Sequence, residues 1–453
     1  MKATGTIKDM TSGNPAKLLF FFAIPLMVGN LFQQMYSMVD TIIVGQGVGV
    51  GALASLGAAD WLNWLFLGLA TGLTQGFAIL LSQNYGAGDV ERLKKTVGVS
   101  ITLTAIASVI FVLAAEGFTT VCLDWMNTPE DIYQGAVLYL RIMFAGLPVM
   151  LFYNLAASIL RALGDSKSPL YAMILAALIN IGLDLLFVLV FRWGIAGAAV
   201  ATVAAQTVSL LYCLAVMKRI DILRLSSEDF YPEKHMAIQL LKLGMPVMFQ
   251  NIVISVGGMV VQSVINQFGF LFVAGFTATN KLYGLLEMAA ISFGYAMTTY
   301  TGQNLGAGKL DRIQQGMKSA AVMAFGTSIV VSILMLVLGR PILGLFVSGD
   351  PSQTEQVLDI AYHYLKVMSY FLVILYALHI YRCALQGLGD TVTPMVSGIA
   401  EFTMRVTAAL LLPRLIGQNG IFYAEIMAWT GAAVILVSAY YLEMHRLTTE
   451  REK

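Results

Sequence analysis

Long apolar segments dominate the pattern of hydrophobic and polar positions along this chain. Runs of about 20 residues or more, the length that an α-helix needs to cross a bilayer, alternate with short segments rich in Gly, Pro and charged residues. We predict twelve membrane-spanning helices from this pattern. The predicted spans are 17–45, 52–82, 96–123, 134–161, 169–191, 194–217, 238–267, 274–303, 317–347, 358–386, 394–416 and 420–444.

The composition points to the same class of protein. Of the 453 residues, 58% are hydrophobic and 12% are charged, whereas a soluble chain has about 25% charged residues. We therefore expect an all-α polytopic membrane protein. The segment Met1 to Thr11 is polar and has no short apolar core, so we expect the first apolar run to be a retained span and not a signal peptide. The net charge of +1 gives no indication of a nucleic-acid partner.

The basic residues predict an orientation. Twenty of the 27 Lys and Arg residues fall in the N-terminal segment, the C-terminal tail and the loops that would share their side, and five fall on the other side. Cytoplasmic loops carry the excess of Lys and Arg. We therefore expect a multi-pass protein of the plasma (inner) membrane with both termini in the cytoplasm.

The two halves of the chain repeat one another. SQNYGAGDVERLKK (82–95) returns as GQNLGAGKLDRIQQ (302–315), and RALGDSKSP (161–169) returns as QGLGDTVTP (386–394). Each half holds six predicted spans, so both begin on the same side and are parallel repeats. We predict two six-helix bundles related by a pseudo-two-fold axis along the membrane normal. The predicted divisions are 1–217 for the N-terminal lobe, 218–237 for a cytoplasmic linker and 238–453 for the C-terminal lobe.

The repeated Gly-rich segments are typical of turns. Glycines allow positive φ, and the acids and amides beside them cap helices. They are not phosphate-binding loops, because none ends in Lys-Ser or Lys-Thr at the required spacing. Cys122, Cys213 and Cys383 stand apart without metal-ligand spacing, and no catalytic triad pattern occurs. We expect neither an enzyme nor a cofactor-dependent protein.

The first span carries a polar stripe. Gln33, Tyr36, Ser37 and Asp40 stand at i, i+3, i+4 and i+7 and so share one helix face. A carboxylate inside a membrane helix costs roughly 2.5–3.5 kcal/mol on insertion scales, and such residues mark ion pathways. Asp40 is therefore a candidate for ion coupling. Pro25 removes one backbone hydrogen bond of the same helix and is a candidate hinge.

The fifth and sixth spans carry the same kind of signal. Asn180 and Asp184 are four residues apart, as are Thr202 and Gln206, so each pair shares a helix face. If Asp184 and Asp40 share one cavity, removal from water and mutual repulsion favour a proton on at least one of them. A bound Na⁺ would suit the same pocket. The alternative is that Asp184 only caps or hydrogen-bonds a neighbouring helix.

Other intramembrane charges have simpler explanations. Glu401 and Arg405 are four residues apart, which is typical of an internal ion pair. Glu287 lies near the middle of the eighth span and fits either a cavity wall or a paired core position. Glu425 and His379 are weaker candidates, because a lone His in a helix is more often satisfied by packing than used as a proton relay.

With these features together, the chain resembles the multidrug and toxic compound extrusion (MATE) transporters. The resemblance runs from IPLMVGNLFQQMYSMVDTIIVG through the paired QN-x-GAG turns to the second LGD-x-x-x-P motif. It implies two bundles around a central cleft, and export driven by a proton or sodium gradient. It is closest to the proton-coupled DinF-like branch, whose pattern is matched by Gln33, Tyr36, Asp40, Asn154, Asn180, Asp184 and Thr202. The sodium-coupled branches place a glutamate where this chain has Ile254.

We therefore expect a monomeric secondary antiporter that exports organic cations across the lipid bilayer. The expected ion-coupling residues, which would also hold Na⁺ if that ion is used, are Asp40, Asn180, Asp184 and Thr202. The expected substrate cavity is lined by Gln33, Tyr36, Tyr139, Asn154, Gln206 and Glu287. No cofactor beyond the coupling H⁺ or Na⁺ is expected, and the natural substrate stays open.

A flippase for a lipid-linked oligosaccharide precursor is the alternative, since such proteins have a similar architecture. A cavity for a diphosphate-linked lipid calls for several Arg or Lys side chains. The N-terminal half instead offers Asp40 and Asp184 and no cation in mid-span. This acidic character favours a cationic cargo. A membrane-embedded enzyme is a third alternative, which the lack of a nucleophile or metal pattern disfavours.

Overall fold

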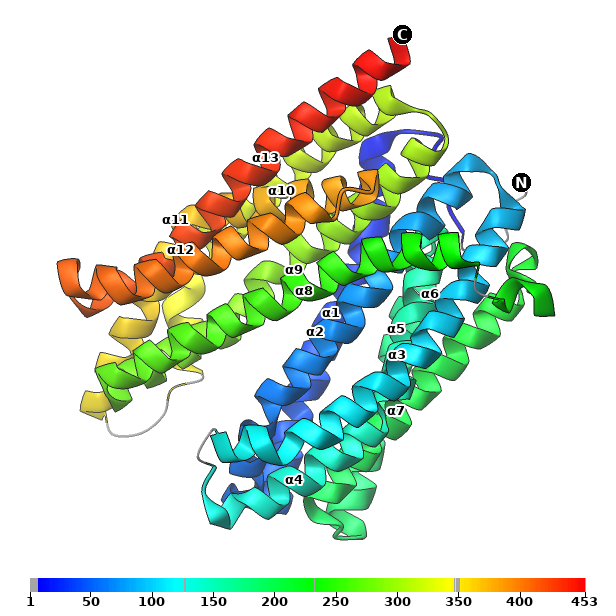
Figure 1. The fold of residues 1–453 in the computed structure, drawn as a ribbon. Helices are drawn as coiled ribbons and strands as arrows, with labels where there is room; N and C mark the ends of the chain where they lie inside the picture. The colour runs from blue at the N-terminus through cyan, green and yellow to red at the C-terminus, as the bar shows by residue number, and fades with distance from the viewer. Residues whose placement is uncertain (1–6, 126–127, 232, 346, 348–350, 453) are drawn as a thin grey trace. The chain divides into compact units, whose positions relative to one another are not determined.

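The computed structural model describes residues 7–125, 128–231, 233–345, 347 and 351–452, and within them every regular element is a helix (Figure 1). The predicted all-α fold is confirmed. The α-helices are α1 (Pro15–Gly47), α2 (Val50–Ala87), α3 (Val90–Trp125), α4 (Glu130–Ala145), α5 (Leu147–Ala162), α6 (Lys167–Asp184), α7 (Gly194–Lys218), α8 (Lys234–Ile265), α9 (Phe270–Gly306), α10 (Leu310–Gly344), α11 (Pro351–Leu388), α12 (Val392–Ile416) and α13 (Tyr423–Glu452). Short helices are the π-helix η1 (Leu185–Val190) and the 3₁₀ helices η2 (Asp221–Leu223), η3 (Ser227–Phe230), η4 (Asn266–Phe268) and η5 (Gln418–Phe422).

Each of the twelve predicted spans coincides with one of these helices or with two that follow one another. Within the described ranges, ten helices are long and apolar enough to cross a membrane. The pair α4 and α5 passes the same test together, with a bend of 48° between them. This pair corresponds to the single predicted span 134–161. The remaining predicted span, 274–303, lies in α9, which carries Lys281 and Glu287 and is not among the helices that pass the test.

The chain divides into two compact units. Unit 1 comprises residues 1–9 and 24–248, and unit 2 comprises residues 10–23 and 249–453. The divisions at 23/24 and 248/249 fall inside α1 and α8, next to Pro25 and Pro246. Both helices continue through their prolines. The predicted lobe boundary at 218–237 stays a prediction.

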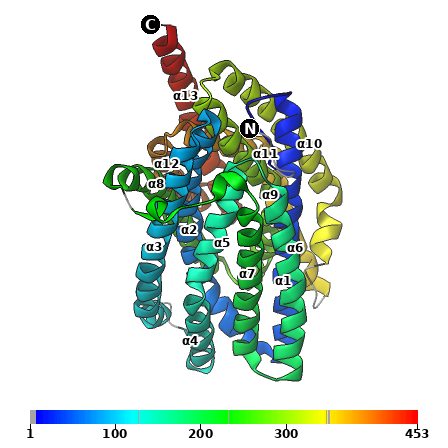
Figure 2. The ribbon, with the colours of Figure 1, turned by 90° about the vertical axis from the view of Figure 1, so that its right-hand side faces the viewer.

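Unit 1 has an apolar core between long helices. The helices α5, α6 and α7 run side by side, with α6 and α5 both packed against α7 (Figure 2). One buried cluster includes Phe77 of α2, Leu160 of α5 and Leu240 of α8. A second includes Phe66 of α2 and Phe144 of α4, whose ring centroids are 4.9 Å apart. Close packing of these apolar side chains holds α2, α4 and α5 together.

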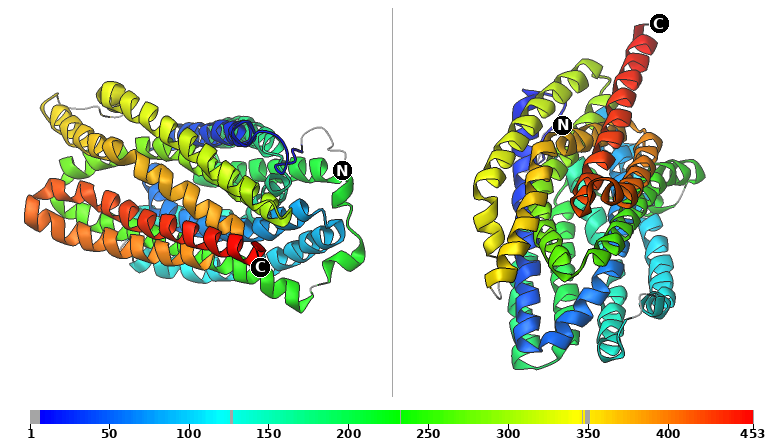
Figure 3. Two further views of the ribbon diagram at one scale, coloured as in Figure 1. Left: turned by 90° about the horizontal axis from the view of Figure 1, so that it is seen from above. Right: turned by 90° about the vertical axis from the view of Figure 1, so that its left-hand side faces the viewer.

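Unit 2 packs around α9 and α11. These helices contact each other along their length, and α12 lies beside α13 (Figure 3). The Thr279 hydroxyl of α9 donates to the Ala361 carbonyl of α11 at 2.8 Å. The Phe276 and Tyr364 rings of the same two helices stack with centroids 4.6 Å apart. Rings and a hydrogen bond therefore join α9 to α11 inside unit 2.

The repeated Gly-rich segments form turns, as predicted. Four of their glycines have positive φ angles of 69–93°: Gly88, Gly164, Gly308 and Gly389. After two of them, Asp165 and Asp390 cap the next helix. The Oδ1 atoms of these aspartates accept the backbone N–H groups of Ser168 and Thr393, each at 2.9 Å. Both halves therefore use the same local chemistry to reverse the chain between helices.

Candidate functional site

The polar stripe predicted on the first span lies on α1. Gln33 and Ser37 are exposed, whereas Tyr36 and Asp40 are half-buried. Gln33 hydrogen-bonds to the Tyr36 side chain one turn along the helix. The four side chains share one helix face because the stretch is continuous α-helix from Pro15 to Gly47.

Asp40 and Asp184 come together within unit 1. Asp184 is fully buried at the last position of α6, where the helix changes to the π-helix η1. The two carboxyl groups interact directly with each other. Asp40 Oδ1 and both carboxyl oxygens of Asp184 are buried and accept no hydrogen bond from a donor in the described part of the chain. Since carboxylate oxygens only accept, two such groups in contact need a proton or another cation between them.

Asn180 and Thr202 lie next to this pair of acids. The Asn180 amide nitrogen donates to Thr202 Oγ1 at 3.5 Å, and the Thr202 hydroxyl donates to the Ala198 carbonyl at 3.0 Å. Asn180 is buried, and its Oδ1 atom accepts no hydrogen bond from the residues described. Asn180 is one turn before Asp184 on α6, so α6 presents an amide oxygen and a carboxylate on the same face.

Two tyrosines face the acids. Tyr36 of α1 and Tyr139 of α4 both interact electrostatically with Asp40 and Asp184. Tyr139 is buried. The group therefore draws on α1, α4, α6 and α7, and it brings together the four predicted coupling residues and three of the predicted cavity residues, Gln33, Tyr36 and Tyr139. A hydroxyl near a carboxyl group can donate to its charged form, so the tyrosines suit a site that changes protonation.

The remaining predicted cavity residues have other surroundings. The Asn154 amide donates to the Met150 carbonyl of its own helix at 2.9 Å. Gln206 is half-buried one turn beyond Thr202 on α7. Glu287 belongs to unit 2, where its contacts are with His379 and Tyr283. The contacts of the described residues do not connect these three to the acidic group, and their role in a substrate cavity stays a prediction.

A third acid of unit 1, which the sequence analysis did not predict as a site residue, lies near Asp40. Asp60 lies on α2 within the apolar segment Ala54–Ala87 and interacts electrostatically with Asp40 and Tyr139. It is exposed, unlike Asp184. The signal for it was present, because an acid within an apolar span is as costly here as at Asp40. Asp60 was not predicted as a site residue, although Asn63 stands at i+3 and gives the same helix face a second polar side chain.

The group does not form a site of the type used by transition metals. Among the described residues, no cluster of three or more His, Cys, Asp or Glu side chains could hold a metal ion. The donors available around Asp40 and Asp184 are carboxylate, amide and hydroxyl oxygens. Oxygen ligands suit hard cations such as alkali-metal ions.

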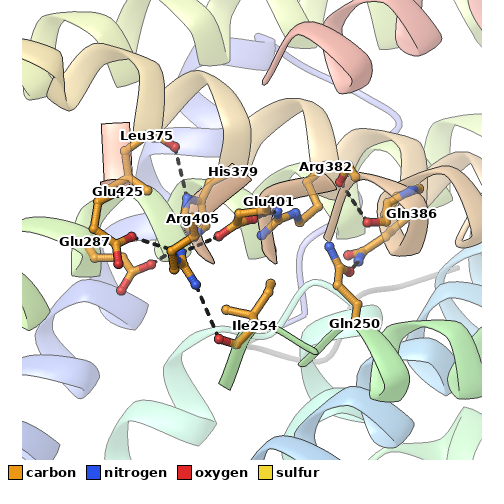
Figure 4. A network of polar contacts seen from close by, with 12 residues as sticks. Gln250, Ile254, Glu287, Leu375, His379, Arg382, Gln386, Glu401, Arg405 and Glu425 are labelled. Atoms are coloured by element: carbon orange, nitrogen blue, oxygen red, sulfur yellow. Dashed lines mark hydrogen bonds and ion pairs between the residues drawn. The ribbon is translucent and has the colours of Figure 1, made fainter. Parts of the chain in front are cut away.

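A second polar network lies in unit 2 (Figure 4). The predicted Glu401–Arg405 ion pair is confirmed, with Oε1 and Nη2 2.8 Å apart. Glu401 also binds Arg382 of α11 at 2.7 Å, and Arg405 binds Glu425 of α13 at 2.9 Å. Arg382 is one of the twenty basic residues that we assigned to the cytoplasmic side, but it lies in α11 with a side chain 11% exposed. The network thus connects α11, α12 and α13.

The Arg405 guanidinium also reaches α8. Its Nη1 donates to the Ile254 carbonyl at 3.3 Å. Ile254 is the position at which the resemblance expects a glutamate in sodium-coupled transporters. Here the site is occupied by an apolar side chain, and a permanently charged guanidinium binds its backbone instead. This arrangement leaves no acid at that position of unit 2.

Comparison with known proteins agrees with this architecture. The model of the MatE family matches residues 25–186 and 246–411. The probable multidrug resistance proteins YpnP and YoeA of Bacillus subtilis are 29% and 28% identical over 414 and 400 residues, covering 91% and 86% of this chain and 92% and 85% of theirs. A solved MOP superfamily transporter from Pyrococcus furiosus superimposes with a TM-score of 0.92 at 24% identity, covering 99% of this chain and all of that one.

The family match covers most of the chain and falls on both repeated halves. The relatives are matched over nearly their whole length, so the likeness includes both units. The structural likeness shows a shared fold. The chain belongs to the MatE family of multidrug and toxic compound extrusion transporters.

Proposed function

We propose that this protein is a secondary antiporter that exports organic cations, and that Asp40 and Asp184 bind the coupling ion. The observation that carries the proposal is the direct contact of these carboxyl groups in an apolar bundle, with buried oxygens that accept no donor from the described residues. Such a pair is stable only with a cation between its members. A site that requires a cation can exchange one, which is the chemical basis of coupling.

The ligands beside the two acids suit either of two coupling ions. A proton needs only the two carboxyl groups. A Na⁺ ion needs several oxygens, and Asn180 Oδ1 and the Thr202 hydroxyl lie beside the acids. We favour the proton, because the resemblance in the N-terminal half is to the proton-coupled branch. The vesicle experiment below separates the two ions.

The same group supports a cationic cargo. Asp60 adds a third carboxyl group and is exposed, while Tyr36 and Tyr139 offer aromatic rings that can bind a cation through their faces. The relatives YpnP and YoeA carry names that denote multidrug resistance. An acidic, aromatic site suits flat organic cations.

The flippase alternative calls for free basic side chains toward a diphosphate. The buried guanidinium groups of Arg382 and Arg405 are already bound by Glu401 and Glu425 in unit 2. The acidic group of unit 1 has no guanidinium or ammonium among its described contacts. These contacts favour the antiporter.

Coupling requires that ion binding favours one conformation of the transporter over another. We propose that a proton at Asp40 changes the bend of α1 between Pro25 and Asp40 and thereby releases the substrate outward. Pro25 lacks the backbone N–H that would stiffen the helix at that point. The proposal links the ion site to the helix that carries it.

The test uses purified protein in liposomes loaded with a fluorescent organic cation. An imposed pH gradient is expected to drive export by the wild type, and an imposed Na⁺ gradient to drive little. Asp40→Asn and Asp184→Asn should reduce export to the level of empty liposomes, because an amide cannot release a proton. Asp131→Asn, at the exposed start of α4, is the matched control and should export normally.

Full export by Asp40→Asn would refute the coupling role and the hinge mechanism together. Export driven by Na⁺ alone would be consistent with the proposed site, but it would show that the coupling ion is Na⁺ and not H⁺. Failure of the wild type to move the dye under either gradient would count against the multidrug function.

A further inference from the structure

The charges of the network in unit 2 do not balance. Two guanidinium groups, those of Arg382 and Arg405, face three carboxyl groups, those of Glu287, Glu401 and Glu425 (Figure 4). Glu401 binds both arginines and Glu425 binds Arg405. In the part of the chain that the structure describes, the ion-pair partner of Glu287 is His379. Glu287 is therefore paired with His379, whose side chain is charged only when it is protonated.

The contacts of His379 show why a proton is needed between its ring and Glu287. Its Nδ1 atom lies 3.0 Å from the Leu375 carbonyl oxygen of the same helix. A carbonyl oxygen only accepts, so Nδ1 carries the hydrogen and Nε2 of the neutral ring has a lone pair. Nε2 lies 3.4 Å from Glu287 Oε1. A lone pair and a carboxylate repel each other, so this contact requires a proton, either on the ring or on the acid.

The surroundings suit a site that exchanges this proton. The Tyr283 hydroxyl hydrogen-bonds to Glu287 from one turn earlier on α9. The side chains of Glu287 and His379 are 26% and 13% exposed, so the pair is not completely enclosed by the surrounding side chains. The charged and titratable groups that face it are Tyr283 of α9, Tyr376 and Arg382 of α11, Glu401 of α12 and Glu425 of α13. Arg405 compensates Glu401 and Glu425 and has no ion pair with Glu287 among the described contacts.

We propose that Glu287 and His379 form a second proton-binding site, which holds one exchangeable proton between α9 and α11 in unit 2. Loss of the proton leaves a carboxylate against the imidazole lone pair and raises the negative charge of a group that already holds Glu401 and Glu425. The contact between the two helices then weakens. The site is separate from Asp40 and Asp184, which belong to unit 1. Only its role in transport rests on the proposed function.

Proton release from purified protein tests the site directly. Wild type in weakly buffered detergent is shifted from about pH 6 to about pH 9, a range in which an ordinary glutamate is already ionised, and the protons released are counted. Glu287→Gln is expected to release one proton fewer than the wild type. Glu228→Gln, an exposed glutamate of η3, is the matched control and should release the same number as the wild type. Equal release by the wild type and Glu287→Gln would overturn the proposal.

Nuclear magnetic resonance of ¹⁵N-labelled histidine gives an independent measurement. The chain has four histidines, and the His379 signal is assigned by its loss in His379→Asn. Below the pH of proton release, its Nδ1 is expected to be protonated. In Glu287→Gln the ring should stay neutral, with Nε2 accepting from the amide, at every pH in the range. An Nε2–H, Nδ1-bare ring in the wild type would contradict the proposed geometry.

The outcome is distinguishable from failure of the proposed function. The same proton count is made on the Asp40→Asn/Asp184→Asn double variant, which is expected to lose export. Adding Glu287→Gln to this double variant should still lower the number of protons released by one. If export fails in the wild type but this difference remains, the second site stands without the antiporter. If the difference vanishes while export persists, the antiporter stands without the second site.

Discussion

Acidic side chains inside the bundles are stabilised in two different ways. In unit 2, Glu401 is 4% exposed and binds two guanidinium groups at 2.7 and 2.8 Å. In unit 1, Asp184 is buried with no guanidinium among the described contacts and interacts with a second acid. Fixed counter-ions make the first acid structural. The second acid has no fixed counter-ion among the described contacts, and for this reason we propose a coupling role for it.

We predict that Glu401→Gln strongly destabilises the protein. An amide cannot compensate two buried guanidinium groups, and breaking a buried ion pair by removing one partner costs about 3–5 kcal/mol. Asp221→Asn breaks the exposed pair with Arg224, whose side chains are 72% and 75% exposed, and should change stability by about 0–1 kcal/mol. Thermal unfolding in detergent measures both. A melting temperature of Glu401→Gln equal to that of Asp221→Asn would contradict the structural role.

At the scale of helices, small residues permit close approach inside unit 1. Gly76 of α2 lies against the backbone of α8, where an added Cβ atom would come within 2.2 Å of Gly244 Cα. That contact is backbone against backbone, so no side chain can move aside. Gly57 on the same helix has no atom within 4 Å of such a Cβ. Close packing against α8 therefore requires a glycine at position 76, whereas nothing in the packing requires one at position 57.

Alanine substitutions on α2 should therefore have opposite signs. Gly76→Ala is expected to destabilise the protein by about 1–3 kcal/mol, because overpacking forces the helices apart. Gly57→Ala should stabilise it by about 0.5–1 kcal/mol, because Ala loses less backbone entropy in a helix than Gly. The midpoint of thermal unfolding measures both variants under one condition. A Gly76→Ala midpoint at or above that of Gly57→Ala would show that α2 and α8 do not approach as described.

At the scale of the whole molecule, the chain is organised by repetition. The Gly-Asp turns recur with the same φ signs and the same capping bonds in both halves, and the family match also falls in two segments. The polar groups are not repeated. Unit 1 has an acidic pair, and unit 2 has a network with two arginines. The duplicated scaffold therefore carries different interior charges in its two halves.

The orientation in the membrane gives a prediction at this scale. Both termini and the segment around Ser226 are expected on the cytoplasmic side, and the segment around Thr128 on the opposite side. Single cysteines at these positions, in a chain without Cys122, Cys213 and Cys383, are treated with a membrane-impermeant thiol reagent. Thr128→Cys should react in intact cells, and Ser226→Cys only after the membrane is opened. The reverse pattern would invert the topology.

The sequence by itself determined the spans, the repeat, the turns and those pairs of residues that the helical period places on one face. The Glu401–Arg405 pair and the shared face of Asn180 and Asp184 follow from the helical period, which sets neighbours at i+4. The bend that splits the span 134–161 was not predicted, although Gly146 and Pro148 stand at it and residues of these types commonly end one helix and begin the next.

Only the tertiary structure decided which helix faces which. Asp40 meets Asp184, Arg382 meets Glu401, and Glu287 meets His379 across pairs of helices. Helical periodicity assigns a residue to a face, but the partner of that face depends on the rotation and axial register of another helix, which packing of the whole unit sets. For that reason Asp60 was overlooked and His379 was read as packing, although the first lies in the acidic group of unit 1 and the second against Glu287.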